Sequence, residues 1–204
     1  AACDFVTKAV TDAGLKVGEQ ISIALDIAST QLFEDNKYHL KNEGKSYSAQ
    51  EFISYISNLV NTHPIISIED PFAEDDWDTW SAFMAIAPKS LQVVGDDLFT
   101  TSATRLARGI ADRSANAILI KPNQNGLVTF TESVLKMAQG EGLRTIVSAR
   151  SGETEDSWLA DLATGWRAEQ IKVGSTHGSD RTAKWNRLLE LEATAKTKFA
   201  NPFN

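Results

Sequence analysis

The sequence is poor in the features that mark secreted, membrane-spanning and nucleic-acid-binding proteins. Its single cysteine, Cys3, excludes a disulfide within the chain and suits a reducing compartment. No apolar run approaches the roughly 20 residues that a spanning helix needs. No basic run is present, and the formal net charge of -7 argues against a nucleic-acid or anionic-membrane partner. We therefore expect a cytoplasmic protein with neither partner.

An initiator methionine is also missing from the start of the sequence. Residues Ala1–Ala13 have the apolar spacing of a helix entered partway through, and Gly14 is placed like a helix stop. We expect the chain to be a piece of a longer protein.

Six short apolar runs, rich in β-branched residues, are typical of strands buried on both faces of a sheet. They are Ile21–Leu25, Ile65–Ile68, Leu91–Val94, Ala117–Ile120, Thr145–Val147 and Gln170–Lys172. Helical patterns alternate with them, at Ala49–Val60, Asp76–Ala85, Thr101–Ala111, Thr129–Gln139, Glu155–Trp166 and Arg181–Leu191. This alternation indicates a parallel α/β architecture. The polar stretch Glu34–Ser48 is predicted to form a loop or a small ribbon.

Polar residues at the ends of the predicted strands distinguish between the two parallel architectures. A barrel carries its chemistry at the carboxyl ends of several strands. An open sheet concentrates its site in one crevice, and the G-x-G-x-x-G fingerprint of its dinucleotide-binding version is absent. Strand-end residues here are Asp26, Glu69, Asp96, Lys121 and Lys172. We predict one domain over residues 1–204, a partial (β/α)8 TIM-type barrel with about six of the eight βα units.

Three carboxylates, those of Asp26, Glu69 and Asp96, follow consecutive predicted strands and are expected to converge. Mg²⁺ prefers oxygen ligands of this kind, and a divalent ion neutralises like charges that lie close together. The alternative is that each acid caps the helix that follows it. One acid alone favours capping, whereas three at a regular interval favour a metal site.

Two lysines, Lys121 and Lys172, follow apolar strands and are expected at the same barrel mouth. A lysine in that position can act as a base or hold an anionic substrate. The alternative is that both form salt bridges with the carboxylates.

Aromatic residues within the predicted helices are interpreted as core. Trp77, Trp80 and Phe83 lie at helical spacing. Trp158, Trp166 and Trp185 receive the same interpretation. The three histidines form no metal-ligand spacing and are assigned no role.

Five segments, taken in chain order, resemble the strand-end motifs of enolase. They are SIEDPF (67–72), GDDL (95–98), IKPNQ (120–124), RSGETED (150–156) and QIKVGS (170–175). The resemblance covers essentially the whole chain. It implies the C-terminal barrel domain of a Mg²⁺-dependent lyase that interconverts 2-phosphoglycerate and phosphoenolpyruvate in glycolysis and gluconeogenesis. It also implies a cytoplasmic, homo-oligomeric parent enzyme whose partner is a small phosphorylated carboxylic acid.

The resemblance further implies a role for each site residue. Asp26, Glu69 and Asp96 would ligate Mg²⁺, with a second Mg²⁺ joining on substrate binding. Lys121 would remove the proton at C2, and Lys172 would hold the substrate carboxylate. The remaining substrate-binding positions are Glu69, Ser148, Ala149, Arg150 and Ser151, with Arg150 on the phosphate.

The chain departs from the enolase pattern in ways that bear on function. Ala149 stands where the family has the histidine of Ser-His-Arg-Ser. The Gly-Asp-Glu-Gly-Gly motif that carries the family's catalytic acid is absent from the sequence, and we expect the N-terminal domain and the first two barrel strands to be missing. Two alternatives follow: a catalytically impaired enolase-like binding protein, and another enolase-superfamily activity on a related carboxylate.

We predict that the 204-residue chain, taken alone, is not a competent enolase and is poorly stable as a monomer. Six units of an eight-stranded barrel leave two open edges. Loss of the acid forfeits about 10²-fold to 10⁴-fold in rate. Phosphoenolpyruvate formation, followed by absorbance with Mg²⁺ present, measures this directly. Turnover comparable to that of an intact enolase would mean that a residue interpreted as scaffold is the acid.

Overall fold

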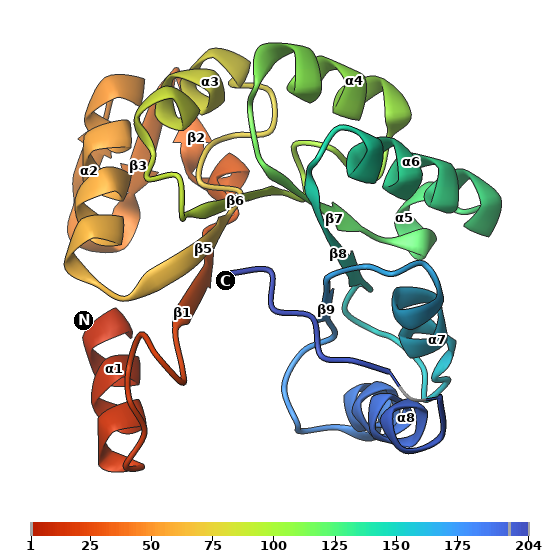
Figure 1. The fold of residues 1–204 in the computed structure, drawn as a ribbon. Helices are drawn as coiled ribbons and strands as arrows, with labels where there is room; N and C mark the ends of the chain where they lie inside the picture. The colour runs from red at the N-terminus through yellow and green to blue at the C-terminus, as the bar shows by residue number, and fades with distance from the viewer. Residues whose placement is uncertain (1, 196, 204) are drawn as a thin grey trace. The chain divides into compact units, whose positions relative to one another are not determined.

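The computed structural model describes residues 2–195 and 197–203 and divides the chain into two compact units. The first unit comprises the chain up to Leu98 together with Ala111–Ala115, and the second comprises Phe99–Ile110 and the chain from Asn116 onward. Parallel strands alternate with helices in both units (Figure 1). Across the described residues, no helix is both long enough and apolar enough to cross a membrane.

Parallel strands of the first unit follow one another in chain order. They are β1 (Ile23–Asp26), β5 (Ile65–Glu69) and β6 (Gln92–Gly95). In register, Asp26 pairs with Glu69 and Glu69 with Val94, so the carboxyl ends of these strands lie at nearly the same level. The helices of this unit include α1 (Ala2–Asp12), α2 (Ala49–Thr62) and α3 (Trp77–Ile86).

Helix α2 shows how the sequence sets a helix boundary and a buried face. Ser48 caps its start: Ser48 N–H donates to Glu51 Oε2 at 2.8 Å, and the hydroxyl accepts from Glu51 N–H at 3.4 Å. This reciprocal pair satisfies donors that the first helical turn leaves open. The buried residues of the helix, at helical spacing, are Phe52, Ile53, Ile56 and Val60.

The polar stretch between β1 and α2, predicted to be a loop or a small ribbon, is a three-stranded antiparallel ribbon. Its strands are β2 (Phe33–Glu34), β3 (Lys37–Leu40) and β4 (Lys45–Tyr47), flanked by the 3₁₀ turns η1 (Ser29–Leu32) and η2 (Lys41–Glu43). Asp35 and Asn36 both have positive φ at the hairpin tip, as a tight turn of this kind requires.

Tyr38 of β3 joins the ribbon to the core of the first unit. Its ring stacks on Phe52 at 4.3 Å between centroids, and Phe52 lies edge-on to Phe72 at 6.1 Å. The Tyr38 hydroxyl donates to Asp76 Oδ2 at 2.6 Å and accepts from Ala73 N–H at 3.1 Å. Burial is the main cause that raises the pKa of this phenol. Tyr38 therefore fixes the loop that follows β5.

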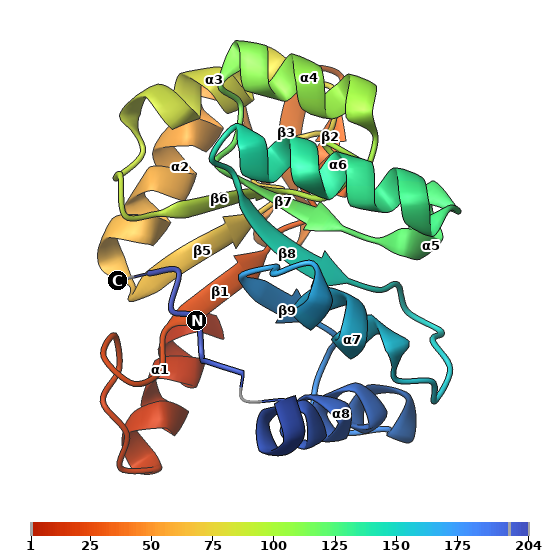
Figure 2. The same ribbon diagram turned by 45° about the vertical axis from the view of Figure 1, so that its right-hand side comes forward.

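The second unit repeats the parallel arrangement. Its strands, in order, are β7 (Ala117–Ile120), β8 (Arg144–Ser148) and β9 (Gln170–Lys172). Helices α5 (Pro122–Asn125), α6 (Val128–Gly140), α7 (Trp158–Gly165) and α8 (Ser179–Ala195) follow these strands (Figure 2). Helix α4 (Ala103–Asp112) begins in this unit and ends in residues assigned to the first.

Most of the predicted elements are confirmed, with three differences. Strands β1 and β9 are not buried on both faces as predicted: Ala24 and Lys172 are exposed, and each strand pairs on one side only within the described sheet. The short helix α5 was not predicted. Trp158 is 43% exposed, so its interpretation as core is wrong, whereas Trp77, Trp80 and Phe83 are buried as expected.

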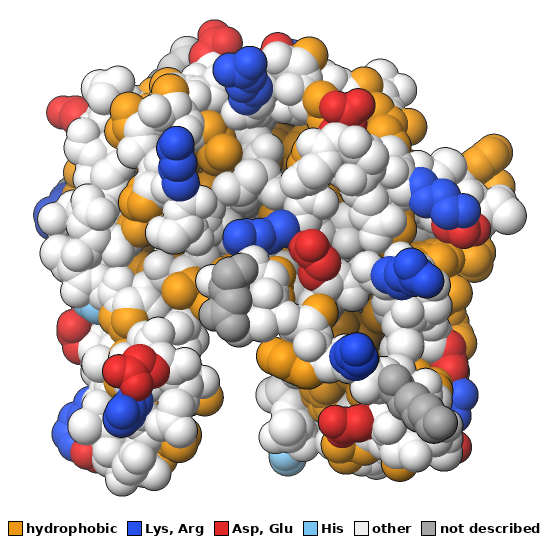
Figure 3. Space-filling model, in the orientation of Figure 1, with side chains coloured by type: hydrophobic (Ala, Val, Ile, Leu, Met, Phe, Trp, Pro, Cys, Tyr) orange, Lys and Arg blue, Asp and Glu red, His pale blue; other side chains and the backbone are white. Residues whose placement is uncertain are grey.

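Charged side chains of both signs are interspersed on the face drawn in Figure 3, with hydrophobic side chains between them. Large hydrophobic residues that remain exposed include Phe5 in α1, Phe130 in α6 and Leu189 in α8. Apolar residues exposed singly on separate helices are usual on protein surfaces.

Gly109 in α4 offers a test of the packing in the second unit. A Cβ at this position would lie 2.3 Å from Cε1 of Phe99, a ring that is fully buried. We predict that Gly109→Ala lowers the free energy of unfolding by about 1–3 kcal/mol, as overpacking does. Urea denaturation of the chain measures the change.

Gly140, the last residue of α6, provides the matched control because a Cβ there has no neighbour within 4 Å. Gly140→Ala should be neutral or stabilising by up to about 1 kcal/mol. Equal stability of the two variants would contradict the packing described around Phe99.

Candidate active site

Three buried carboxylates gather at the carboxyl ends of β5 and β6. Glu69 is the last residue of β5, Asp70 follows it, and Asp96 comes directly after β6. Each of the three offers an oxygen within 4.8 Å of the others. The residues are only 6%, 2% and 8% exposed, respectively. Glu69 and Asp96 therefore converge as predicted, and Asp70 joins them unpredicted.

Asp70 binds the backbone at the end of the neighbouring strand. Its Oδ1 accepts from Asp96 N–H at 3.0 Å, and its Oδ2 accepts from Asp97 N–H at 2.8 Å. Burial raises the pKa of Asp70 to about 8, although the two N–H donors act to lower it. Its φ of 41° is left-handed, a conformation that aspartate tolerates better than most residues. The carboxylate of Asp70 therefore orients the residues after β6.

Asp26 lies at the end of β1, in register with Glu69. Residues in register on adjacent parallel strands project from the same face of the sheet, so Asp26 neighbours the cluster on the side of β1. It is exposed and is not one of the three carboxylates whose oxygens lie within 4.8 Å of one another. Its predicted role as a metal ligand stays a prediction.

The donor set of the cluster fits a hard divalent cation such as Mg²⁺. Three carboxylates offer only oxygen ligands, and their burial makes uncompensated negative charge costly. Both oxygens of Asp70 already accept backbone N–H groups, which suits an outer, orienting role. Glu69 and Asp96 are therefore the ligand candidates within the cluster.

In the second unit, Lys121, Ser148 and Lys172 mark the ends of three adjacent strands. Lys121 directly follows β7, and Ser148 is in register with Lys172. The pairing of Ile120 with Val147 puts Lys121 at the level of Ser148. Lys121 is half-buried and Lys172 exposed. Both lysines thus occupy the predicted strand-end positions.

Ser148 and Thr101 hold the backbone at these strand ends. The Ser148 hydroxyl donates to Lys172 O at 2.8 Å. Thr101, in the loop before α4, accepts from Lys121 N–H at 3.0 Å. The role of Thr101 was not predicted from the sequence, where Thr101 was only the first residue of the predicted helix Thr101–Ala111.

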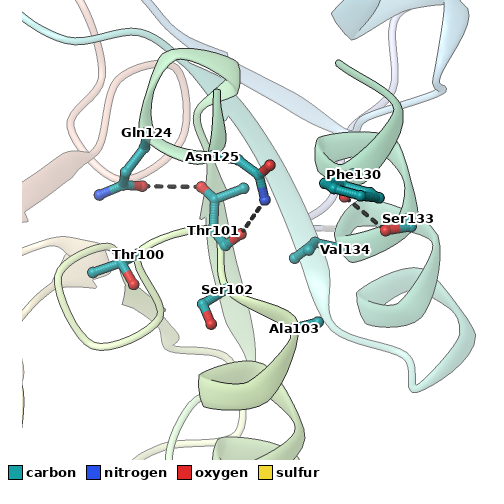
Figure 4. A pocket seen from close by; sticks show the side chains of 9 residues that line it. All are labelled: Thr100, Thr101, Ser102, Ala103, Gln124, Asn125, Phe130, Ser133 and Val134. Carbon is teal, nitrogen blue, oxygen red and sulfur yellow. Dashed lines mark hydrogen bonds between the residues drawn. The ribbon is translucent and has the colours of Figure 1, made fainter. Parts of the chain in front are cut away.

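Thr101 also joins the loop to α5 and borders a pocket of about 360 Å³ (Figure 4). Its hydroxyl donates to Gln124 Oε1 and its carbonyl accepts from Asn125 Nδ2, both at 3.0 Å. The pocket lies among Thr100, Thr101, Ser102, Ala103, Gln124, Asn125, Phe130, Ser133 and Val134. No predicted site residue lines it.

The segment after β8 carries the remaining predicted substrate-binding residues. Ala149 is half-buried, whereas Arg150 and Ser151 are exposed, and Gly152 turns the chain with a φ of 85°. The predicted site residues therefore divide between the two units: Asp26, Glu69 and Asp96 lie in the first, and Lys121, Ser148, Ala149, Arg150, Ser151 and Lys172 in the second.

Comparison with known families identifies the fold. A family model described as "Enolase, C-terminal TIM barrel domain" matches residues 1–201. Together with the parallel βα units in both parts of the chain, the match confirms the predicted partial (β/α)8 barrel.

We predict that Asp96→Ala removes most of the measurable Mg²⁺ affinity, because a buried carboxylate ligand is lost. Asp70→Asn should weaken Mg²⁺ binding about 10-fold to 100-fold, the usual cost of losing an outer-shell partner, because its amide NH₂ would face a backbone N–H. Isothermal titration with Mg²⁺ gives both values. Asp12→Asn in α1 is the control and should bind normally. Unchanged affinity in Asp96→Ala would refute the site.

Proposed function

Because the chain belongs to the enolase C-terminal TIM barrel domain family, we propose that it is the part of an enolase that binds Mg²⁺ and removes the proton. The reaction is the reversible dehydration of 2-phosphoglycerate to phosphoenolpyruvate, carried out by a cytoplasmic, homo-oligomeric parent enzyme. The observation that carries the proposal is the cluster of buried carboxylates at the strand ends.

The carboxylates of the first unit provide the metal site in this proposal. Glu69 and Asp96 hold Mg²⁺ within the cluster, and Asp26 completes the set from the adjacent strand. Asp70 keeps the backbone after β6 in place through its two N–H contacts. When bound, Mg²⁺ neutralises the negative charge that develops on the substrate carboxylate.

The residues of the second unit remove the proton and bind the anionic groups of the substrate. Lys121 takes the proton from C2, while Lys172 pairs with the substrate carboxylate and Arg150 with the phosphate. Removal of a proton beside a carboxylate builds a dianionic enolate, so cationic side chains at this position stabilise the transition state more than the ground state. The hydrogen bond from Lys121 N–H to Thr101 Oγ1 fixes the backbone of the proposed base.

One observation favours a second candidate, an enolase-like protein whose remaining role is binding. Ala149 places a methyl group where the family has an imidazole, between the anchored Ser148 and the exposed Arg150. The same change would suit an enolase-superfamily activity on a different carboxylate. Both alternatives predict that C2 proton exchange of 2-phosphoglycerate is absent or slow.

Proton exchange distinguishes these functions because it reports the base independently of the acid. In the chain completed with an enolase upstream half, we predict that Lys121→Ala slows exchange of the C2 proton with deuterium by about 10²-fold to 10⁴-fold. Lys136→Ala, a change to an exposed lysine in α6, serves as the control and should exchange at the parent rate. NMR of 2-phosphoglycerate in D₂O follows the reaction. Parent-rate exchange in Lys121→Ala would rule out the assigned base.

A further inference from the structure

Lys184 of α8 is a buried lysine that the proposed reaction does not use. Its side chain is 1% exposed. Its Nζ donates to the Thr154 carbonyl at 2.5 Å and lies 4.0 Å from Glu153 Oε2. A buried ammonium is tolerated where oxygen acceptors replace its lost water. Both of these acceptors belong to the segment that follows β8.

Glu153 extends this contact to α5, the short helix that begins directly after Lys121. Its other oxygen, Oε1, accepts from Asn123 Nδ2 at 2.7 Å. Asn123 lies in α5, two residues after Lys121. One carboxylate therefore lies between α8 and the residues that follow β7, and it joins the segment after β8 to both.

A second contact ties the same segment to the start of α8. Ser179, the first residue of the helix, donates to Glu155 Oε1 at 2.5 Å. The three consecutive residues Glu153, Thr154 and Glu155 are thus all held by α8. At the other end of the segment, Ser148 is fixed to β9 through its hydrogen bond to the Lys172 carbonyl.

These anchors leave only Ala149–Gly152 between two fixed points. The short bridge includes Arg150 and Ser151, which are expected to bind the substrate, with Arg150 on its phosphate. A chain held at both ends over four residues has little conformational freedom to lose on binding. Its side chains are therefore presented from a nearly fixed backbone.

We propose that Lys184, Glu153 and Asn123 are positioning residues that hold segment 149–152 beside the end of β7. The side chain of Lys184 acts from α8 through Glu153 and Thr154, and it touches neither substrate nor metal. The contacts stand independently of the reaction, whereas their consequence for substrate binding rests on the proposed function.

Hydrogen exchange of the intact 204-residue chain tests, without a substrate, whether these contacts hold the segment after β8 in place. Lys184→Met keeps most of the side chain's length and removes the ammonium. We expect amides of residues 149–156 to exchange at least about tenfold faster in this variant, while β8 and the middle of α8 keep their protection. Glu153→Gln, a milder change that still accepts from Asn123, should produce a smaller acceleration in the same segment.

Two further variants separate anchoring from general stability. Lys184→Arg retains the charge and should restore exchange to within about threefold of the parent. Lys136→Met removes an exposed lysine that pairs with Glu132, and it should leave exchange unchanged. Unaltered exchange at 149–156 in Lys184→Met would overturn the proposal, as would equal acceleration throughout β8, α7 and α8.

A titration with 2-phosphoglycerate and Mg²⁺ then tests the functional consequence. We expect Lys184→Met to weaken substrate affinity about tenfold relative to the parent chain, since a freed segment must be ordered on binding. Faster exchange with unchanged affinity would overturn the positioning role. If 2-phosphoglycerate does not bind to the parent chain, the proposed function is rejected. The exchange data alone would then show whether Lys184 and Glu153 hold the segment after β8.

Discussion

Parallel hydrogen-bonded register is the constraint on which the candidate site depends. Neighbouring strands lie about 4.8 Å apart, and residues in register project from the same face. Glu69 is paired with Asp26 on one side and with Val94 on the other, two residues before Asp96. The acids are therefore crowded by the backbone itself, before any side chain adopts its conformation. The same pairing aligns Ser148 with Lys172.

Three strand ends share a further feature: a side chain at or just after the end of one strand binds the backbone at or after the end of the next strand. Asp70, after β5, accepts N–H groups of the residues after β6. Thr101, after β6, accepts the N–H of Lys121 after β7. Ser148, at the end of β8, donates to the carbonyl at the end of β9. Each unit thus has its own hydrogen bonds that hold the backbone at these strand ends, and short polar side chains make them.

The sequence predicted the elements well where periodicity was strong. Strands Ala117–Ile120 and Gln170–Lys172 have the predicted bounds, because a buried strand must be apolar and loop residues end it. Burial of the end strands was mispredicted, since an apolar run does not reveal how many neighbours a strand has. The strand-end acids and lysines were predictable because a barrel carries its chemistry there.

What could not be predicted depends on contacts between distant loops. Asp70 was passed over because a carboxylate that binds backbone N–H groups looks, in sequence, like any other acid beside a motif. Thr101 was assigned to a helix, although its backbone is left-handed with a φ of 51°. Lys184 lies within the predicted helix Arg181–Leu191, whose pattern does not mark it as buried. In each case the partner lies at least 20 residues away, beyond the reach of any local pattern.

The ribbon between β1 and α2 has a consequence for how this chain tolerates change. Tyr38 is buried and forms hydrogen bonds to the loop after β5. The hairpin tip at Asp35 and Asn36 is exposed, and both residues have the positive φ of a tight turn. The two ends of a single hairpin therefore differ in their freedom to evolve. Its tip can lengthen, shorten or accept a grafted peptide, while Tyr38, three residues after Asp35, is tied to the loop that follows β5.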